Sequence, residues 1–508
     1  MTLWRRRGGS SAGGAAAPTG RYRLGLRVRR ALLAAAAAAA GGAIAAAASG
    51  SPTARPSARL GGDWTRFGYT ASRTSSGPAR TGITAANVRT LERRRVTLDG
   101  TVDSSPIYLR SALVDGGRYD VVVVTTSYGK TIAIDAASGR TLWRFTPPGY
   151  ASWAGSYRIT NATPLADPSR RFVYAASPDG KIHKLRLADG REVAGWPVAI
   201  TRLPAREKIA APLNLSRGLL LASTGGYLGD EPPYQGHVVG IDARTGRIVH
   251  VWNALCSDRH ELIDPSSCPE SDSAIWARAG VVVDPATGNL LVATGNGTFD
   301  GVRYWGDSVL MLTPDAGRLL QNWTPTNHEE LNSGDLDLGS TAPALLGQNL
   351  AAQSGKDGKL RLLDLRRLNG KGGAGPVTGG ELQTLSTPSG QGLFSAPAVW
   401  RSGGRTWLFV SDFGATAAYV LDGRRLRVVW RAPIAGTSPV VAGGLLYVYN
   451  PNGGLNVLLP QTGKRLAVLP AGSGHWNSPI VTDGRVVLPE GSANDHLEQG
   501  VLDIYRLP

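Results

Sequence analysis

Residues 105–143 read SPIYLRSALVDGGRYDVVVVTTSYGKTIAIDAASGRTLW, a short unit of apolar runs separated by turn residues. The unit opens on Ser-Pro, passes through Val121–Thr125, and closes on Asp135, Gly139 and Trp143. Its β-branched and aromatic residues favour strands, and its Asp-Gly and Ser-Gly pairs favour tight turns. A sheet of this size cannot bury both of its faces alone, so it must pack against further sheets like itself.

Similar units follow along the rest of the chain, and most of them begin at a Pro and close on a Gly followed by a Trp. The eight units start at Pro106, Pro164, Pro212, Ile275, Pro343, Pro397, Pro439 and Pro479. Small sheets that repeat in this way and are arranged radially form a β-propeller. The sequence therefore predicts an all-β, eight-bladed β-propeller with a central channel, in which Leu91–Leu98 supplies the outer strand that the last blade lacks.

The N-terminal part has the composition of an export signal. Five Arg within residues 21–30 precede the apolar run Ala31–Ala48, which ends in small residues suited to cleavage. An uncleaved membrane anchor is the alternative, although Ala contributes little to insertion. We predict an export signal at residues 1–48, a linker at residues 49–60 and a single propeller domain at residues 61–508. The mature protein is then secreted, periplasmic or in the cell envelope, without a membrane span, and we expect a monomer.

The net charge of +17 does not by itself indicate a nucleic-acid partner. Residues 1–60 contain ten Arg and no acidic residue, so the remainder has 45 basic and 38 acidic residues and a net charge of +7. Binding to phosphates needs clustered Lys and Arg, and only Arg93–Arg95 forms such a run. We therefore predict a small molecule or a protein as the partner, and no nucleic acid.

The chain has two cysteines, Cys256 and Cys268, which lie in one loop, CSDRHELIDPSSC. In an exported protein two close cysteines are expected to form a disulfide. A metal site that includes His260 is the alternative, but these three residues lack a fourth ligand.

Two units contain long insertions at positions where the other units turn tightly. They are Gly225–Gly236 and Gly295–Gly306, and long loops on a rigid scaffold are common binding sites. A third insertion, Asn369–Gly392, is Gly-rich and reads as a flexible surface linker. Two polar stretches of the last units, residues 475–477 and 494–496, are placed to line one end of the channel, although each of their His residues can equally be structural.

Several short motifs resemble a known family. Asp63-Trp64, Asn87-Val88 and the unit closings Asp135-Ala136-x-x-Gly139 and Asp242-Ala243-x-x-Gly246 are similar to the quinoprotein (pyrroloquinoline quinone) dehydrogenases and their propeller relatives. The resemblance covers about residues 62–508 and implies the eight-bladed fold. The same motifs recur in relatives that are not enzymes, so they do not specify an activity.

The resemblance also implies a set of site residues. The family's enzymes hold pyrroloquinoline quinone (PQQ) over a Trp and bind calcium beside it, which makes PQQ and calcium the candidate cofactors. Asn296 matches the family's Asn metal ligand, Asp307 matches its catalytic base and would share the metal, and Trp276 lies near the place of the Trp below the quinone. If this site is retained, the three residues must converge on the channel.

Asp307 is also unusual within the repeat. The other units have Gly at the equivalent position, namely Gly129, Gly180, Gly236, Gly358 and Gly454. A carboxylate at the start of an inner strand can accept a proton from a hydroxyl group, as a general base must. The alternative is that Asp307 caps its own hairpin through a local hydrogen bond.

Tyr227 stands where the family has a Glu metal ligand, and Asp230 and Glu231 follow it in the same loop. Calcium binds about six to eight oxygens, so Asn296 and Asp307 alone would hold it weakly. We therefore interpret the chain first as an exported propeller that acts as a binding or assembly module, with its ligand at the mouth of the ring. The alternative is a PQQ- and calcium-dependent dehydrogenase that oxidises an alcohol or a sugar.

Overall fold

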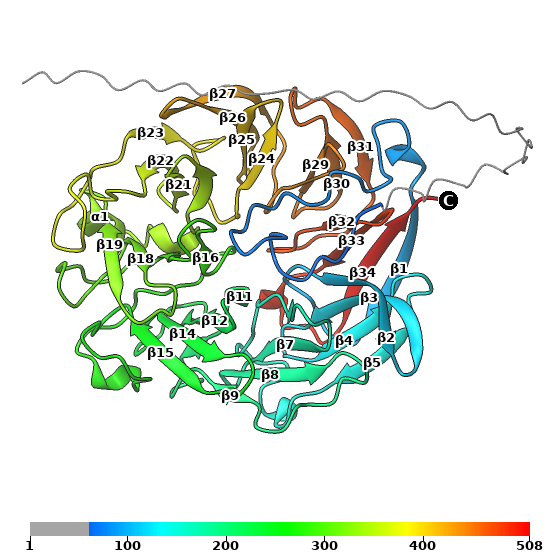
Figure 1. Cartoon of the computed structure of the whole chain (residues 1–508), viewed down its shortest axis with the longest axis horizontal. Coiled ribbons are helices and arrows are strands. Elements are labelled where there is room, and N and C mark those ends of the chain that lie inside the picture. The colour runs from blue at the N-terminus through cyan, green and yellow to red at the C-terminus, as the bar shows by residue number, and fades with distance from the viewer. Residues whose placement is uncertain (1–59) are drawn as a thin grey trace, which may run out of the picture. The chain divides into compact units, whose positions relative to one another are not determined.

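The computed structural model describes residues 60–508, which form eight four-stranded antiparallel sheets around a central channel (Figure 1). The predicted eight-bladed, all-β propeller is thereby confirmed. The predicted export signal at residues 1–48, and the predicted linker up to residue 59, lie outside the described residues.

Each blade is a sheet in which four strands pair in chain order, except for the last blade, where the first strand of the chain completes the sheet. Blade 1 contains β2 (Ile107–Val114), β3 (Gly117–Thr125), β4 (Thr131–Asp135) and β5 (Thr141–Phe145), and blade 2 contains β6 (Leu165–Ala166), β7 (Phe172–Ser177), β8 (Lys181–Arg186) and β9 (Val198–Ala199). Blade 3 contains β11 (Asn214–Ser216), β12 (Leu219–Ser223), β14 (His237–Asp242) and β15 (Ile248–Asn253), and blade 4 contains β16 (Val282–Val283), β17 (Leu290–Ala293), β18 (Val309–Leu312) and β19 (Leu319–Trp323).

The second half of the ring repeats this arrangement. Blade 5 contains β20 (Ala344–Gly347), β21 (Leu350–Ser354), β22 (Lys359–Asp364) and β23 (Gln383–Ser386), and blade 6 contains β24 (Ala398–Ser402), β25 (Arg405–Ser411), β26 (Thr416–Asp422) and β27 (Arg425–Ala432). Blade 7 contains β28 (Val440–Ala442), β29 (Leu445–Tyr449), β30 (Leu455–Leu458) and β31 (Arg465–Leu469), and blade 8 contains β32 (Ile480–Thr482), β33 (Arg485–Glu490), β34 (Gly500–Arg506) and β1 (Glu92–Leu98).

The remaining elements are short. They are the strand pair β10 (Glu207–Lys208) and β13 (Gly225–Gly226), the helix α1 (His328–Ser333), and the 3-10 turns η1 (Val88–Thr90), η2 (Tyr150–Ser152), η3 (Pro265–Ser267), η4 (Leu338–Ser340) and η5 (Ala493–Asp495). The expectation that Asn369–Gly392 is only a flexible linker was wrong in its last third. That stretch contains β23, whose backbone hydrogen bonds to β22 complete blade 5.

Neighbouring blades pack face to face through apolar side chains. Between blades 2 and 3, Tyr174 and Ile182 share one buried cluster with Leu220 and Val239. Full burial of one such side chain contributes roughly 1.5–3 kcal/mol. Because each sheet gives one face to the blade before it and the other to the blade after it, no blade has a solvent-exposed apolar face to protect.

The Gly and Trp at the close of a unit form one contact between two blades. The Trp143 indole donates from Nε1 to the Leu187 carbonyl, 2.8 Å away, and its ring covers Gly190 of the next blade. A Cβ at Gly190 would lie 2.5 Å from that ring, and a Cβ at Gly463 would lie 2.7 Å from the Trp430 ring. The Trp of one unit therefore requires the Gly of the next, which explains why the two residues recur together.

The ring closes where β1 pairs antiparallel with β34, from Glu92 opposite Arg506 to Leu98 opposite Gly500. This confirms the predicted role of Leu91–Leu98. Arg93 of β1 reaches back to two carboxylates of blade 8: its Nη2 lies 2.6 Å from Asp503 Oδ2 and 3.0 Å from Glu490 Oε1.

Burial, opposed by the hydrogen bond from Arg93 and reinforced by the charge of Glu490, raises the pKa of Asp503 to about 6. Asp503 is fully buried, so its charge depends for compensation on Arg93, which donates a hydrogen bond to it, and on the more distant Arg95.

The segment between Leu60 and Thr84 lies across one end of the channel, in dark blue at the centre of Figure 1. Backbone hydrogen bonds attach it to blade after blade, for example from Val283 N to Ala71 O, from Val399 N to Thr74 O and from Gly77 N to Val441 O. It contacts the hairpins between the first two strands of the blades, so the opposite face carries the segments that lead into each first strand.

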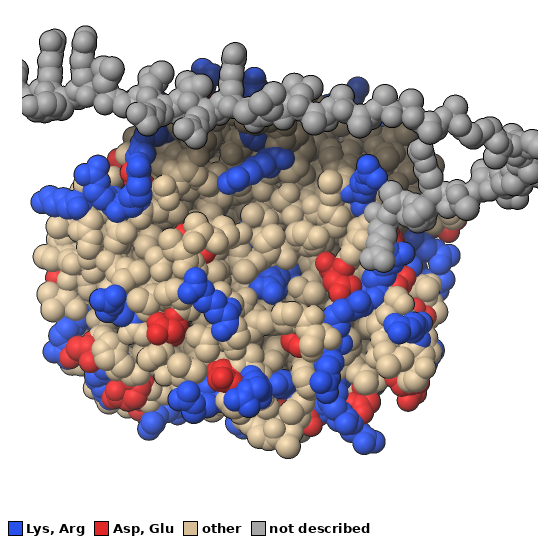
Figure 2. All heavy atoms as spheres, in the orientation of Figure 1, with Lys and Arg blue, Asp and Glu red and all other residues tan. Residues whose placement is uncertain are grey.

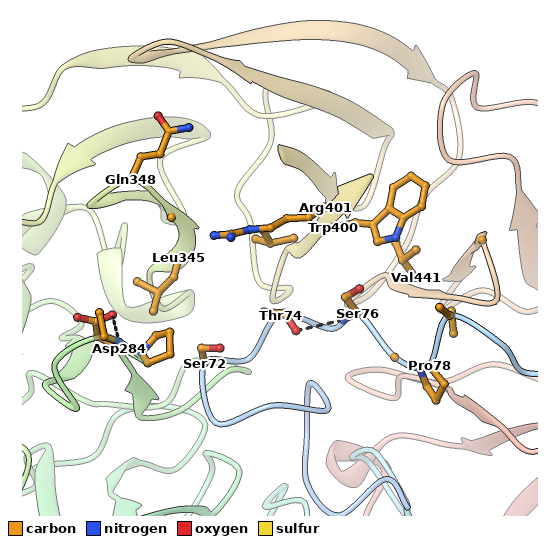
Figure 3. Close-up of a pocket in the computed structure, with 18 of the residues that line it drawn as sticks. Ser72, Thr74, Ser76, Pro78, Asp284, Leu345, Gln348, Trp400, Arg401 and Val441 are labelled. Atoms are coloured by element: carbon orange, nitrogen blue, oxygen red, sulfur yellow. Dashed lines mark hydrogen bonds between the residues drawn. The ribbon is translucent and has the colours of Figure 1, made fainter. Parts of the chain in front are cut away.

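A hollow of about 680 Å³ lies between this segment and blades 4–7. Figure 3 shows Ser72 and Ser76 of the segment on one side and Trp400 and Arg401 of blade 6 on the other. Its charged side chains are Asp284, which is half-buried, and Arg401, which is exposed. The hollow therefore lacks the buried charged groups that mark a functional site.

One loop confirms a further prediction. Cys256 and Cys268 form the expected disulfide, with their Cα atoms 6.2 Å apart. On the face seen in Figure 2, Lys and Arg are interspersed with Asp and Glu. Within residues 60–508, no helix combines the length and the apolarity that crossing a bilayer requires.

Replacement of Arg93 by Met is expected to weaken the closure of the ring. The buried Asp503 carboxylate would lose its hydrogen bond from Arg93 and keep only the longer ion pair with Arg95, whose Nε lies 3.7 Å from Asp503 Oδ1. A hydrogen bond to a charged group contributes roughly 2 kcal/mol. Arg94→Met is the matched control, because Arg94 lies on the other face of β1, is exposed and donates only to the Ser138 carbonyl. Urea unfolding measures the stability of both variants. An equal loss of stability in the two would contradict the role of Arg93 in closing the ring.

Candidate functional site

A cavity of about 320 Å³ lies in the channel, at the end opposite the N-terminal segment. Its walls come from the residues that lead into the first strands of several blades, among them Asn161, Trp276, Asp337, Phe394 and Trp476. Residues at equivalent positions of different blades meet only on the axis of the ring. The cavity therefore lies where the channel opens.

Aromatic side chains form one wall of the cavity. The Trp276 ring centroid lies 6.1 Å from that of Phe394 and 6.4 Å from that of Trp476, and Phe394 and Trp476 are 5.5 Å apart. Lys356 Nζ lies 5.8 Å from the Trp276 centroid, over the ring. The wall offers a flat apolar surface with a cation beside it, which suits a planar aromatic ligand.

Asp337 brings a carboxylate into the cavity, just before the 3-10 turn η4. Its Oδ1 accepts from the Asn296 backbone N–H at 2.7 Å, and its Oδ2 lies 2.7 Å from Lys356 Nζ. Burial raises the pKa of Asp337, and the Lys356 ammonium opposes this only in part. A carboxylate whose pKa is raised is suited to accept a proton.

His475 also lines the cavity and is held from behind by Asp103. Asp103 Oδ2 accepts from His475 Nδ1 at 2.8 Å and from Asn161 Nδ2 at 2.8 Å, and Oδ1 accepts from the Trp476 N–H at 2.7 Å. Burial alone would raise the pKa of Asp103, but the hydrogen bond and charge of His475 and the charge of Arg278 outweigh it and lower the pKa. The ionised carboxylate thus fixes the imidazole with Nε2 turned away from it.

Two further cations line the cavity. Burial lowers the pKa of Arg278 to about 10 and that of Lys208 to about 8, each in spite of the Asp103 charge. Arg278 donates to the Ala210 carbonyl at 3.3 Å and to the Asn161 carbonyl at 3.2 Å, while its Nε has no partner among the described residues. No hydrogen bond or ion pair to the Lys208 ammonium is found within residues 60–508.

The structure brings two of the three predicted site residues together. Trp276 and Asn296 line the cavity, and the Asn296 backbone N–H is hydrogen-bonded to Asp337; their roles toward a quinone and a metal stay predictions. Asp307 does not line it: the side chain is completely buried, and its Oδ1 accepts from the Leu338 N–H at 2.9 Å. The assignment of Asp307 as base and metal ligand stays a prediction that this position does not favour.

A conformational reason explains why Asp307 stands where other units have Gly. Its φ of 45° is in the left-handed region, as are those of Gly129, Gly180 and Gly358, at 85°, 73° and 68°. Asp is one of the few residues besides Gly that adopt this conformation at modest cost. Asp307 therefore replaces Gly because both residues tolerate this backbone conformation, and the replacement is no evidence that Asp307 faces the channel.

The donors for calcium are incomplete. The Tyr227 hydroxyl donates to the carbonyls of Pro178 and Pro204, at 3.3 and 3.1 Å, and Glu231 pairs with Arg206 away from the cavity lining. Within residues 60–508, no three His, Cys, Asp or Glu side chains are grouped closely enough to hold a metal ion. Asp230 lines the cavity, but its Oδ1 already accepts from the Tyr234 hydroxyl at 3.0 Å, and together with Asn296 and Asp337 it does not provide the about six to eight oxygens that calcium needs.

Sequence reasoning identified residues 475–477 and 494–496 as candidates for one end of the channel, and the structure places His475, Trp476 and Asn494 in the cavity. It missed Asp337 and Lys356. The available signal was position: Asp337 precedes its first strand just as Trp276 does, and Lys356 lies in the hairpin after the second strand, where Phe413 lies in blade 6.

Comparison with known proteins places this geometry in context. The model of the PQQ family described as "Glucose/ethanol/alcohol dehydrogenase, beta-propeller domain" matches residues 64–320. Quinohemoprotein alcohol dehydrogenase ADH IIB of Pseudomonas putida is 26% identical over 360 residues, 62% of this chain and 47% of that protein. The dehydrogenase subunit of the quinone alcohol dehydrogenase of Acetobacter aceti is 22% identical over 58% of this chain and 43% of its own length. The chain thus spans less than half the length of these curated relatives.

Solved structures show the same fold. Quinohemoprotein alcohol dehydrogenase from Comamonas testosteroni aligns with a TM-score of 0.65 and 17% identity, covering 88% of this chain and 80% of that one. A europium-containing methanol dehydrogenase aligns with a TM-score of 0.65 and 16% identity, over 88% of this chain and 98% of the other. At these identities the likeness concerns the fold alone.

Replacement of Asp307 by Asn is expected to change how stability depends on pH. Burial, opposed by the Leu338 N–H, raises the pKa of Asp307 to about 8, so the folded state keeps this proton after the unfolded state, with a pKa near 4, has lost it. The contribution of Asp307 to stability therefore falls as the pH rises from about 4 to about 8.

The Asn variant does not lose stability in this way. Its free energy of unfolding should match that of the parent near pH 4.5 and exceed it at pH 8.5 by more than about 1 kcal/mol. Urea unfolding at the two pH values measures this, with Asp258→Asn, at an exposed position, as the control. A parallel pH dependence of parent and Asp307→Asn would refute the raised pKa.

Proposed function

The chain belongs to the PQQ family of glucose/ethanol/alcohol dehydrogenase β-propeller domains, and we propose that its channel cavity binds a planar, polyanionic cofactor of the quinone type. The observation that carries the proposal is the pairing of the Trp276 wall with cations that lack partners. The Lys208 ammonium and the Arg278 Nε face no acceptor among the described residues, and Lys356 lies over the Trp276 ring. A flat ligand can stack on the Trp276 ring, and its carboxylates can accept hydrogen bonds from Lys208 and Arg278.

The size of the cavity supports a ligand of this kind. About 320 Å³ is at the lower end of the range for small-molecule sites, which begins at roughly 300 Å³. Polar groups from several blades surround the aromatic wall, so a bound ligand would be held in one orientation. When bound, a quinone supplies the capacity to accept two electrons, which none of the side chains that line the cavity possesses.

Calcium is not part of the proposal. Tyr227 replaces the expected carboxylate and is tied to two carbonyls, and Lys356 already neutralises Asp337. We propose that the Lys356 ammonium provides the positive charge beside Asp337 that a metal ion would otherwise provide. Under this proposal, the propeller is a binding module, as the sequence was first interpreted, and its ligand is a cofactor.

We place this binding outside the cytoplasm. The Cys256–Cys268 disulfide supports an oxidising compartment, because such bonds are rare where thiols are kept reduced. The predicted monomeric state stays a prediction.

Titration with PQQ tests the proposal. PQQ is expected to quench the fluorescence of the protein with a dissociation constant that changes less than about twofold when calcium is replaced by EDTA. Trp276→Ala should weaken binding at least about tenfold, because the ligand loses the face on which it stacks. Trp400→Ala is the control, since Trp400 lines the hollow at the other end of the channel. Binding that requires calcium, or that is equally weakened by both variants, would contradict the proposal.

The second candidate function is the oxidation of a hydroxyl group by the bound quinone. The observation in its favour is that Asp337, a carboxylate of raised pKa, lies in the same cavity as Trp276 and is held there from two sides. Asp337 would accept the hydroxyl proton on a carboxylate oxygen, and the aromatic wall would exclude water from the reacting groups.

Asp337→Asn is expected to reduce dye-linked oxidation of alcohols and sugars by the PQQ-loaded protein at least about a hundredfold, the usual contribution of a general base. The amide still accepts from the Asn296 N–H, so PQQ affinity should change little. Asp335→Asn is the matched control, because Asp335 binds the same Lys356 ammonium from an exposed position. Turnover that survives in Asp337→Asn would rule out this role, and a parent protein that binds PQQ without turnover would leave binding as the function.

A further inference from the structure

Lys208 lines the cavity and, among the described residues, forms no ion pair, although the charges of Asp103 and Asp230 act on it from a distance. Lys356, the other lysine in the lining, lies 2.6 Å from Asp335 Oδ1 and 2.7 Å from Asp337 Oδ2. Around Lys208 Nζ, within residues 60–508, no carboxylate oxygen lies close enough to form an ion pair. In the cavity, Lys208 Nζ therefore has free N–H donors when it is an ammonium and a free lone pair when it is a neutral amine.

The backbone around Lys208 is held firmly. Lys208 is in β10, which pairs with β13, Lys208 lying opposite Gly225. The preceding Glu207 is fully buried: its Oε1 accepts from the Gln235 N–H at 3.1 Å and lies 2.9 Å from His237 Nε2. Because its neighbour is fixed in this way, the Lys208 side chain extends into the cavity from a defined point.

The surroundings of Lys208 disfavour its charged form. The Arg278 guanidinium is close enough to lower the pKa of Lys208 further, in addition to the effect of burial. A lysine that is desolvated beside another cation is the usual form of an amine nucleophile in proteins. At its pKa of about 8, a substantial fraction of Lys208 is a free amine in mildly alkaline solution, whereas an exposed lysine is almost entirely ammonium.

Asp230 lies in the same cavity lining and can serve as the acid that this chemistry requires. Burial raises its pKa, and its Oδ1 accepts from the Tyr234 hydroxyl at 3.0 Å. Lys208 and Asp230 influence each other's pKa, so the two groups are near neighbours although they form no ion pair.

We propose that Lys208 is a nucleophilic amine that captures carbonyl compounds, in particular small oxo acids, as an imine in the channel cavity. The Nζ lone pair attacks the carbonyl carbon, and a C–N bond forms while the carbonyl π electrons move to oxygen. The oxygen takes up two protons and leaves as water; Asp230 can donate one of them and is reprotonated by the second N–H proton, so both protons come in net from the nitrogen. Amine and carbonyl therefore give imine and water without an oxidant. The Arg278 guanidinium, with its unpartnered Nε, is placed to bind the carboxylate of an oxo acid.

The test uses the full folded protein with glyoxylate and sodium cyanoborohydride, which reduces an imine to a stable secondary amine. Intact mass and peptide mapping at pH 8 should show one adduct, on Lys208, formed at least about tenfold faster than on any exposed lysine. Lys208→Arg keeps the positive charge but removes the nucleophile, so it should abolish this adduct. Lys464→Arg, at an exposed hairpin of blade 7, should leave it unchanged.

Each outcome decides the inference. Adducts spread over surface lysines without preference for Lys208 would overturn it, and this result needs only the parent protein, even if a variant fails to fold. The inference uses the cavity of the proposed function but not the identity of its cofactor. Capture at Lys208 without PQQ binding would therefore refute the quinone proposal alone, whereas Trp276-dependent PQQ binding without capture would refute the nucleophile alone.

Discussion

The pairing of β1 with β34 is the constraint on which every other feature of this protein depends. Eight blades contribute to the channel, but they surround an axis only if the first strand of the chain completes the last sheet. The cavity is built from residues that precede the first strands of different blades, so no part of it exists in an open ring. Arg93 and its two carboxylate partners thus stabilise the site from the opposite end of a blade.

The charge distribution in the cavity follows from burial. Asp103 stays ionised because it accepts hydrogen bonds from three segments that are distant in sequence, and Asp337 is compensated by Lys356. Arg278 and Lys208 are not compensated to the same degree. The result is a cavity in which, in the described part of the chain, the Lys208 ammonium and the Arg278 Nε have no paired acceptor beside an aromatic wall, which is a costly arrangement for a protein unless a ligand completes it.

Much of the fold could be predicted from the sequence, because the repeat specifies one sheet and the Gly and Trp of successive units specify how sheets pack. The outer strand of blade 5 was not predicted, because β23 follows a Gly-rich stretch and has no Trp to mark it. The site was predicted in part. Trp276, Asn296 and Asp307 were all assigned through the family's motifs. The exchange of Gly for Asp307 added support to its assignment, but it reflects a left-handed backbone. Asp337, Lys356 and Lys208 could not be found in the same way, because only the closed ring brings them together.

The N-terminal segment gives the channel two unlike ends. Its hydrogen bonds to successive blades cover one end, and the cavity lies at the opposite end. A ligand of the cavity is therefore expected to enter and leave by the uncovered end. The chain also enters the propeller on the covered side, where the Leu60 carbonyl accepts from the Asp483 N–H. The opening of the cavity consequently faces away from the side of the ring on which Leu60 lies.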